Sequence, residues 1–230
     1  MQGVLRRPSR AFLRIKKDSN MKKTTLALVM GLMISGAANA ALEANIGATS
    51  NYMWRATTQT SDDAAVSGGL DYSHDSGAYA GIWTSNLDNG AETDYYAGFA
   101  GETEGGFGYD LGYIYYAYSD AGDADFAEVY GSLTISGITA GIAAEVSQQG
   151  SSDPDNKYFS LSKDFELSDG FGLTATAGIY DFEAASSDYN HLTLDLAKDD
   201  FTFSLSKVFS SDNSSLDDGL IPYVSYSKTF

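Results

Sequence analysis

Apolar and polar residues alternate along most of this sequence, and this pattern restricts the possible folds more than any other feature. Between Leu42 and Trp54, apolar residues occupy every second position except Ser50, and mostly polar or small residues lie between them. A period of two with unlike faces predicts a strand that is covered on one side only. The segments that we expect to be strands are 42–54, 64–72, 78–87, 93–102, 107–115, 127–135, 138–146, 157–166, 171–179, 191–196, 201–206 and 221–230.

The connections between these segments alternate in length. Five are short, at residues 74–77, 103–106, 136–137, 168–170 and 198–200. The others are longer and acidic, around residues 57–63, 86–92, 118–125, 147–156, 181–188 and 210–219. Outer-membrane barrels place long loops outside and tight turns on the periplasmic side, and strands of roughly ten residues cross a bilayer obliquely. The sequence therefore predicts an all-β fold, a transmembrane up-and-down antiparallel β-barrel of about 12 strands.

The first 40 residues differ from the rest of the chain. They contain eight of the 14 basic residues and one of the 31 acidic residues. From Met21 a basic start, an apolar run and small residues ending at Ala40 are typical of a secretory signal peptide, and the run is too short to be a spanning helix. We therefore expect an upstream basic extension at 1–20, which a misassigned start at Met1 would explain, a signal peptide at 21–40 and the barrel at 41–230.

The charge after residue 40 limits the partners. This part of the chain keeps six basic and 30 acidic residues, whereas nucleic-acid binding needs a basic surface, so no nucleic acid is expected. The absence of cysteine excludes disulfides and cysteine-ligated metal sites. We expect contacts with outer-membrane lipid and lipopolysaccharide, with small polar solutes as the cargo, and we expect no cofactor.

The strand ends carry two further signals. The last segment has apolar residues at alternate positions and ends at Phe230, like the C-terminal strand that the barrel assembly machinery reads, although Lys228 departs from that pattern. Aromatic residues near strand ends predict belts at both membrane interfaces. The expected periplasmic belt is Tyr72, Tyr79, Phe107, Tyr109, Phe171, Phe201 and Phe230, and the expected outer belt is Tyr52, Trp54, Tyr95 and Tyr115.

Residues 50–60, SNYMWRATTQT, and residues 66–86, VSGGLDYSHDSGAYAGIWTSN, carry a family resemblance. The first run has the order Ser-Asn-Tyr-x-x-Arg-x-x-x-Gln-Thr, and residues 105–118 form a third, Gly- and Tyr-rich run. In these runs the sequence resembles the TorF-type porin family of proteobacteria. The resemblance implies an outer-membrane barrel that forms a channel, and it names no substrate.

The polar faces of the expected strands assign residues to the lumen. The pore-lining candidates are Glu43, Arg55, Asp71, Asp110, Glu128, Glu145 and Asp195. Arg55 is the only arginine after residue 40, and it could bind an anionic solute or pair with an acid across the lumen; a buried cation without a partner is costly, which favours pairing. Acidic pore linings attract cations. The leading hypothesis is therefore a porin for passive diffusion of small polar solutes with a preference for cations.

Two alternatives come from other classes. The first is a barrel hydrolase with a rim site near His191, which lies close in sequence to Ser186 and Asp188, although no catalytic residue can be assigned. The second is a structural or adhesive barrel with a plugged lumen, because 12 strands lie between barrels filled by side chains and barrels with a channel. Acidic residues around 120–125, 153–155 and 212–219 match no defined calcium loop, so no metal site is expected.

Overall fold

The computed structural model describes residues 40–120, 124–150, 155–182, 187–211, 216 and 218–230. The expected extension at 1–20 and nearly all of the expected signal peptide at 21–40 lie outside the described residues and stay predictions. Apart from strands, the described residues form one short 3₁₀ turn, η1 (Ser168–Gly170). None of the described segments is a helix that is long and apolar enough to cross a membrane.

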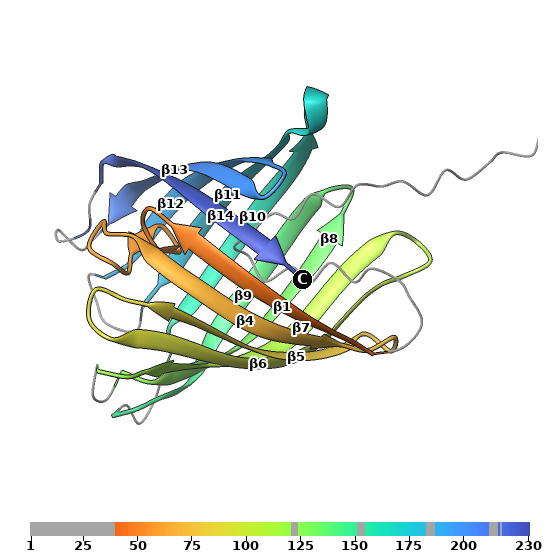
Figure 1. Ribbon diagram of the computed structural model, residues 1–230, viewed down its shortest axis with the longest axis horizontal. Coiled ribbons are helices and arrows are strands. Elements are labelled where there is room, and N and C mark those ends of the chain that lie inside the picture. The colour runs from red at the N-terminus through yellow and green to blue at the C-terminus, as the bar shows by residue number, and fades with distance from the viewer. Residues whose placement is uncertain (1–39, 121–123, 151–154, 183–186, 212–215, 217) are drawn as a thin grey trace, which may run out of the picture.

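Twelve antiparallel strands close into a barrel in which neighbours in the chain are neighbours in the sheet, and β14 pairs with β1 (Figure 1). The strands are β1 (Ala41–Thr49), β4 (Ala65–Ser73), β5 (Ala78–Asn86), β6 (Ala91–Glu102), β7 (Phe107–Tyr118), β8 (Phe126–Ile135), β9 (Ile138–Gln148), β10 (Lys157–Glu166), β11 (Gly172–Asp181), β12 (Tyr189–Lys198), β13 (Phe201–Ser211) and β14 (Leu220–Thr229). The predicted all-β, up-and-down antiparallel barrel with 12 strands is confirmed. Closure leaves no unpaired sheet edge.

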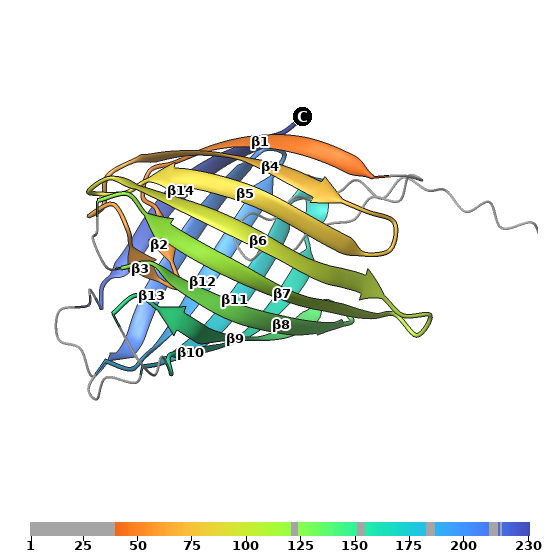
Figure 2. The same ribbon diagram turned by 90° about the horizontal axis from the view of Figure 1, so that it is seen from below.

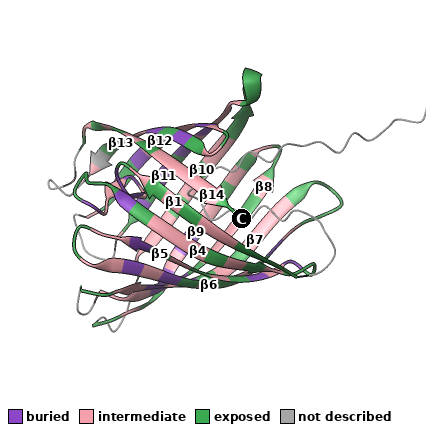
Figure 3. Ribbon diagram, viewed as in Figure 1, coloured by how far each residue is buried: buried purple, intermediate pink, exposed green. Residues whose placement is uncertain are grey.

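The alternation in the sequence gives the barrel wall an apolar outer face and a polar inner face. Large apolar side chains such as Leu111 and Leu133 point outward and are exposed, whereas Ser204 and Ser206 point inward and are buried. Figure 3 shows exposed and less exposed residues alternating along the strands. The outer wall is therefore apolar and the inner wall, which borders the lumen, is polar.

The connections leave the barrel at opposite ends: in Figure 1 the end of β1 and the connection that follows it are at the left, whereas the turn between β6 and β7 is at the right. The turn at Ser136 and Gly137 has positive φ at both residues, which matches the twist of a two-residue hairpin. One expected long connection is short: β5 ends at Asn86 and β6 begins at Ala91, because residues 87–90 form a tight turn in which Leu87 donates its backbone N–H to the Gly90 carbonyl.

The first predicted strand, 42–54, is too long. β1 ends at Thr49, whose hydroxyl bonds the backbone oxygen of Asn51, and the chain then turns into the barrel. There β2 (Met53–Trp54) and β3 (Thr57–Thr58) form a separate two-stranded hairpin. The hairpin also has a period of two, so the alternation continues across the turn and conceals the strand end.

For three of the expected belt residues, Tyr52, Trp54 and Tyr79, the prediction is wrong. Tyr52 and Tyr79 are buried inside the barrel, because their hydroxyls donate to the lumenal carboxylates of Glu92 and Asp110. Trp54 packs on the inner side against Tyr116 and other rings. Four of the other expected periplasmic belt residues are exposed, namely Tyr72, Phe107, Phe201 and Phe230.

Candidate functional site

The β2–β3 hairpin lies within the barrel, at the end with the long connections (Figure 2). Ala56 of its turn is buried in a cluster with Tyr180 and Tyr189, which come from β11 and β12, and with Val208 from β13. The Tyr189 hydroxyl donates to the backbone oxygen of Arg55 at 2.8 Å. The hairpin is therefore held by side chains of the inner wall, since it shares no sheet hydrogen bonds with the barrel strands.

The hairpin turn is built from unusual residues. Arg55 and Ala56 both have positive φ, at 49° and 68°. Turns of this kind favour Asn-Gly, and a residue with a Cβ atom costs about 1–2 kcal/mol in the left-handed region. The contacts of Arg55 and Ala56 with the barrel wall offset that strain, and the ion pair of Arg55 is one of them.

Arg55 pairs with Glu128 of β8 through two parallel hydrogen bonds. Its Nη1 donates to Oε1 at 2.8 Å and its Nη2 donates to Oε2 at 2.7 Å. The Arg55 and Glu128 side chains are 11% and 1% exposed. Burial alone disfavours the charged form of Arg55, but the adjacent carboxylate outweighs it and raises the pKa of Arg55 above its usual range. Of the two alternatives for Arg55, the structure shows the pair with an acid.

Aromatic rings surround the same guanidinium. Its central carbon lies 4.2 Å from the ring centroid of Trp54, 4.4 Å from that of Tyr158 and 5.0 Å from that of Tyr180. The Tyr116 hydroxyl donates to the Glu128 carboxylate at 3.2 Å. We call Glu128, Tyr116, Tyr158 and Tyr180 the guanidinium pocket, and all of its members belong to barrel strands.

A second anchor joins the hairpin segment to β6. The Tyr52 hydroxyl donates to Glu92 Oε1 at 2.8 Å, and burial together with this carboxylate raises the pKa of Tyr52. Glu92 and Asp94 are 2% and 4% exposed and face the lumen. Neither acid is among the predicted pore-lining residues, because the strand is expected to begin at residue 93 and its noisier alternation assigns no inward face. Glu92, Asp94 and Tyr96 occupy alternate positions, and this spacing is the sequence signal that would place all three on one face of the strand.

The other predicted pore-lining acids lie on the inner wall, where Glu43 is the register partner of Asp71, but they do not gather in one site. Asp71 accepts hydrogen bonds from Asn45 and Tyr96, Asp110 accepts one from Tyr79, and Asp195 accepts one from Ser204. Glu145 accepts one from Asn156 and lies opposite Glu128 on the neighbouring strand. Glu43 is exposed near the turn end of the barrel. Their role in lining a pore stays a prediction.

The five lysines after residue 40 all lie at outward positions of strands, namely Lys157, Lys163, Lys198, Lys207 and Lys228. Lys228 of β14 forms an ion pair of 2.7 Å with Asp200, which explains how a lysine is accommodated near the C-terminus. Lys198 lies 4.5 Å from the Phe171 ring centroid. In the described part of the barrel, most strand acids therefore face the lumen, Asp181 at the end of β11 being an exception, and the lysines do not.

His191 lies inside the barrel wall rather than at an open rim. Its side chain is buried, with Nε2 2.9 Å from the Tyr158 hydroxyl and Nδ1 3.4 Å from that of Thr193. Asp188 instead accepts the backbone N–H of Phe182, and Ser186 lies outside the described residues. Within the described chain no acid orients His191, as a general base would require.

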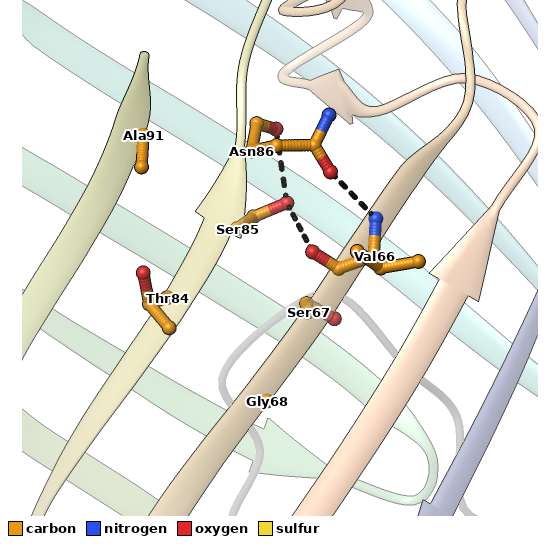
Figure 4. Close-up of a pocket in the computed structure, with 7 residues that line it drawn as sticks. All are labelled: Val66, Ser67, Gly68, Thr84, Ser85, Asn86 and Ala91. Atoms are coloured by element: carbon orange, nitrogen blue, oxygen red, sulfur yellow. Dashed lines mark hydrogen bonds between the residues drawn. The ribbon is translucent and has the colours of Figure 1, made fainter. Parts of the chain in front are cut away.

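The described residues contain no group of three or more metal-ligating side chains. Much of the acidic loop sequence, 121–123, 153–154, 212–215 and 217, lies outside the described residues. A shallow pocket between β4, β5 and β6 is shown in Figure 4, and there Asn86 and Ser85 bond the backbone of Val66. These polar groups satisfy one another, so the pocket offers little to a ligand.

Three solved structures align with this chain. One chain, from work on the in-meso crystallization of membrane proteins, aligns with a TM-score of 0.55 at 10% identity over 82% of this chain and 83% of its own. The NanC porin aligns at 0.45, with 13% identity over 82% and 98% of the two chains. The outer membrane protein OpdK of Pseudomonas aeruginosa aligns at 0.42, with 16% identity over 85% and 68%. The first of these likenesses supports the barrel fold alone.

The sequence matches none of the curated proteins. It does match, over residues 34–214, a family described as bacterial protein of unknown function (Gcw_chp). The match includes the hairpin, the guanidinium pocket and all the strands from β1 to β13. The protein belongs to the Gcw_chp family of bacterial proteins.

Proposed function

We propose that this protein is an outer-membrane porin of the TorF type, through which small polar solutes diffuse passively and cations pass more readily than anions. The distribution of charge carries the proposal. Described acids such as Asp71, Asp110 and Asp195 face the lumen, the lysines point outward, and Arg55 is neutralised by Glu128. A lumen with this excess of negative charge concentrates cations and repels anions.

The outer wall supports the location. Exposed apolar side chains surround the barrel, and an apolar surface of this extent is unfavourable in water. A closed barrel satisfies its backbone hydrogen bonds internally, as a lipid environment requires. Phe230 is exposed at the end of the last strand, where the assembly machinery would read it. Cell fractionation that recovered the protein in the soluble periplasmic fraction would contradict this location.

The hairpin favours a second candidate, a structural or adhesive barrel with a plugged lumen. Residues from β6, β8, β10, β11 and β12 hold the hairpin inside, and 12 strands leave limited room around it. Conductance distinguishes the two candidates. Purified protein in a planar bilayer should give discrete steps and a cation-selective reversal potential in a salt gradient.

A matched variant lacking residues 51–60 makes the test decisive. If the wild type and this variant both fail to conduct, the barrel is structural; if only the variant conducts, the hairpin is a plug. Anion selectivity in either protein would contradict the proposed role of the lumenal acids.

A further inference from the structure

We propose that the guanidinium pocket is a receptor site for a small solute that carries a guanidinium group, and that Arg55 occupies this site when the solute is absent. The inference rests on the proposed cation-preferring channel and names a class of solute for it. Binding of the solute then displaces Arg55 from the pocket and releases the hairpin.

The pocket already holds a guanidinium in a fully formed site. Glu128 accepts two parallel hydrogen bonds from Arg55, and the rings of Tyr158 and Tyr180 lie within 5.0 Å of its central carbon. These groups come from β8, β10 and β11, so they stay in place when the hairpin moves. Of the contacts described above, only the ring of Trp54 comes from the hairpin itself.

The geometry selects a guanidinium over other cations. A planar fork of N–H groups matches both carboxylate oxygens and stacks on aromatic faces, whereas an ammonium group is a compact and strongly hydrated point charge. Anionic solutes are disfavoured, because Glu145 lies opposite Glu128 and the other buried acids Glu92 and Asp94 also face the lumen.

A solute can displace Arg55 because the hairpin has few stabilising contacts within itself. Each of its strands has two residues, they pair only with each other, and both turn residues have positive φ. An isolated two-stranded hairpin is marginal in water. Departure of Arg55 alone would leave the Glu128 charge buried and unpaired, which is strongly unfavourable. A guanidinium solute removes that penalty by taking its place.

The direct test uses residues 41–230 in detergent with the substitution Arg55→Ala, which empties the pocket, and calorimetric titration with methylguanidinium. Ethylammonium is the matched probe with the same charge. We expect methylguanidinium to bind at least about tenfold more tightly than ethylammonium, and at least about tenfold more tightly than to Arg55→Ala/Glu128→Gln. The control Arg55→Ala/Asp164→Asn neutralises an acid that bonds Thr174 near the turn end, and it should bind like Arg55→Ala.

The wild type should bind methylguanidinium more weakly than Arg55→Ala, because the tethered Arg55 competes at high effective concentration. Equal affinity of the two proteins would place any binding elsewhere and overturn the proposal. So would equal binding of the two probes, or equal losses from Glu128→Gln and Asp164→Asn.

A second measurement covers the case in which Arg55→Ala does not fold. Methylguanidinium should speed hydrogen exchange of the amides at residues 52–60 in the wild type, and ethylammonium should not. Unchanged exchange with both probes would refute the exchange mechanism. Binding in detergent requires no conduction. Binding without conductance would therefore support the guanidinium site and contradict the proposed channel. Conductance without binding would support the channel and contradict the site.

Discussion

Arg55 and Glu128, 73 residues apart in the chain, form two parallel hydrogen bonds across the inside of the barrel. Arg55 is at the tip of a hairpin that belongs to no barrel strand, and Glu128 belongs to the wall. This pair neutralises the only arginine after residue 40, and together with the Tyr189 and Tyr52 hydrogen bonds it holds the hairpin in the lumen. The pair therefore joins the lumenal hairpin to the barrel wall.

Breaking the pair should release the hairpin. Glu128→Gln leaves the buried Arg55 charge without its anion, and loss of one partner of a buried pair costs about 2–5 kcal/mol. We expect trypsin to cleave after Arg55 in the variant and to spare this bond in the folded wild type. Asp195→Asn is the control, because Asp195 is a lumenal acid bonded to Ser204 and has no contact with Arg55. Equal resistance of all three proteins would show that the pair does not hold the hairpin.

A disulfide should lock the hairpin in place. Ala56 and Val208 are packed in one buried cluster, and the chain has no cysteine of its own. In Ala56→Cys/Val208→Cys we expect lower single-channel conductance under oxidising conditions and recovery on reduction. The two single-cysteine variants should not respond to the reductant. If the oxidised protein conducts like the reduced one, hairpin movement does not control the lumen.

Lumenal acids should set ion preference. Neutralising Asp71, Asp110 and Asp195 together should shift the reversal potential in a salt gradient toward zero. We expect this loss of cation selectivity because these carboxylates border the lumen. Asp169→Asn/Asp199→Asn removes charge from turns at the barrel end, where salt screens it over about 8 Å, and should change the potential less. A larger effect of the turn variant would contradict the assigned pore lining.

Tags should report the orientation of the barrel. Insertions within residues 88–90, 121–123 or 213–216 are expected to be reachable by antibody on intact cells, since the described strand ends that flank them lie at the barrel end that we assign to the outside. Insertions at 75–76 or 104–105 are expected to need permeabilised cells. The opposite accessibility would invert the assignment, and with it the side from which a solute meets the hairpin.

The sequence was sufficient to predict the barrel but not the hairpin that lies in its lumen. Alternation and connection lengths predicted 12 strands, and the inward positions of Glu128 and Glu145 followed from parity alone, because neighbouring side chains in a strand point to opposite faces. The same parity failed at Tyr52 and Trp54, since a hairpin that enters the lumen has the same period as a strand that continues. Tyr79 was misplaced because an aromatic residue suits either a membrane interface or a lumenal hydrogen bond.

What the sequence determined by itself was therefore local: the period of two, the strand and turn positions, and the sign of the charge on each face. Only the tertiary structure decided that residues 51–60 fold inward, that Arg55 reaches Glu128 between the rings of Tyr158 and Tyr180, and that Tyr52 bonds Glu92. The reason is physical. These contacts join residues far apart in the chain, and closure of the barrel with its strand registers brings them within hydrogen-bond reach.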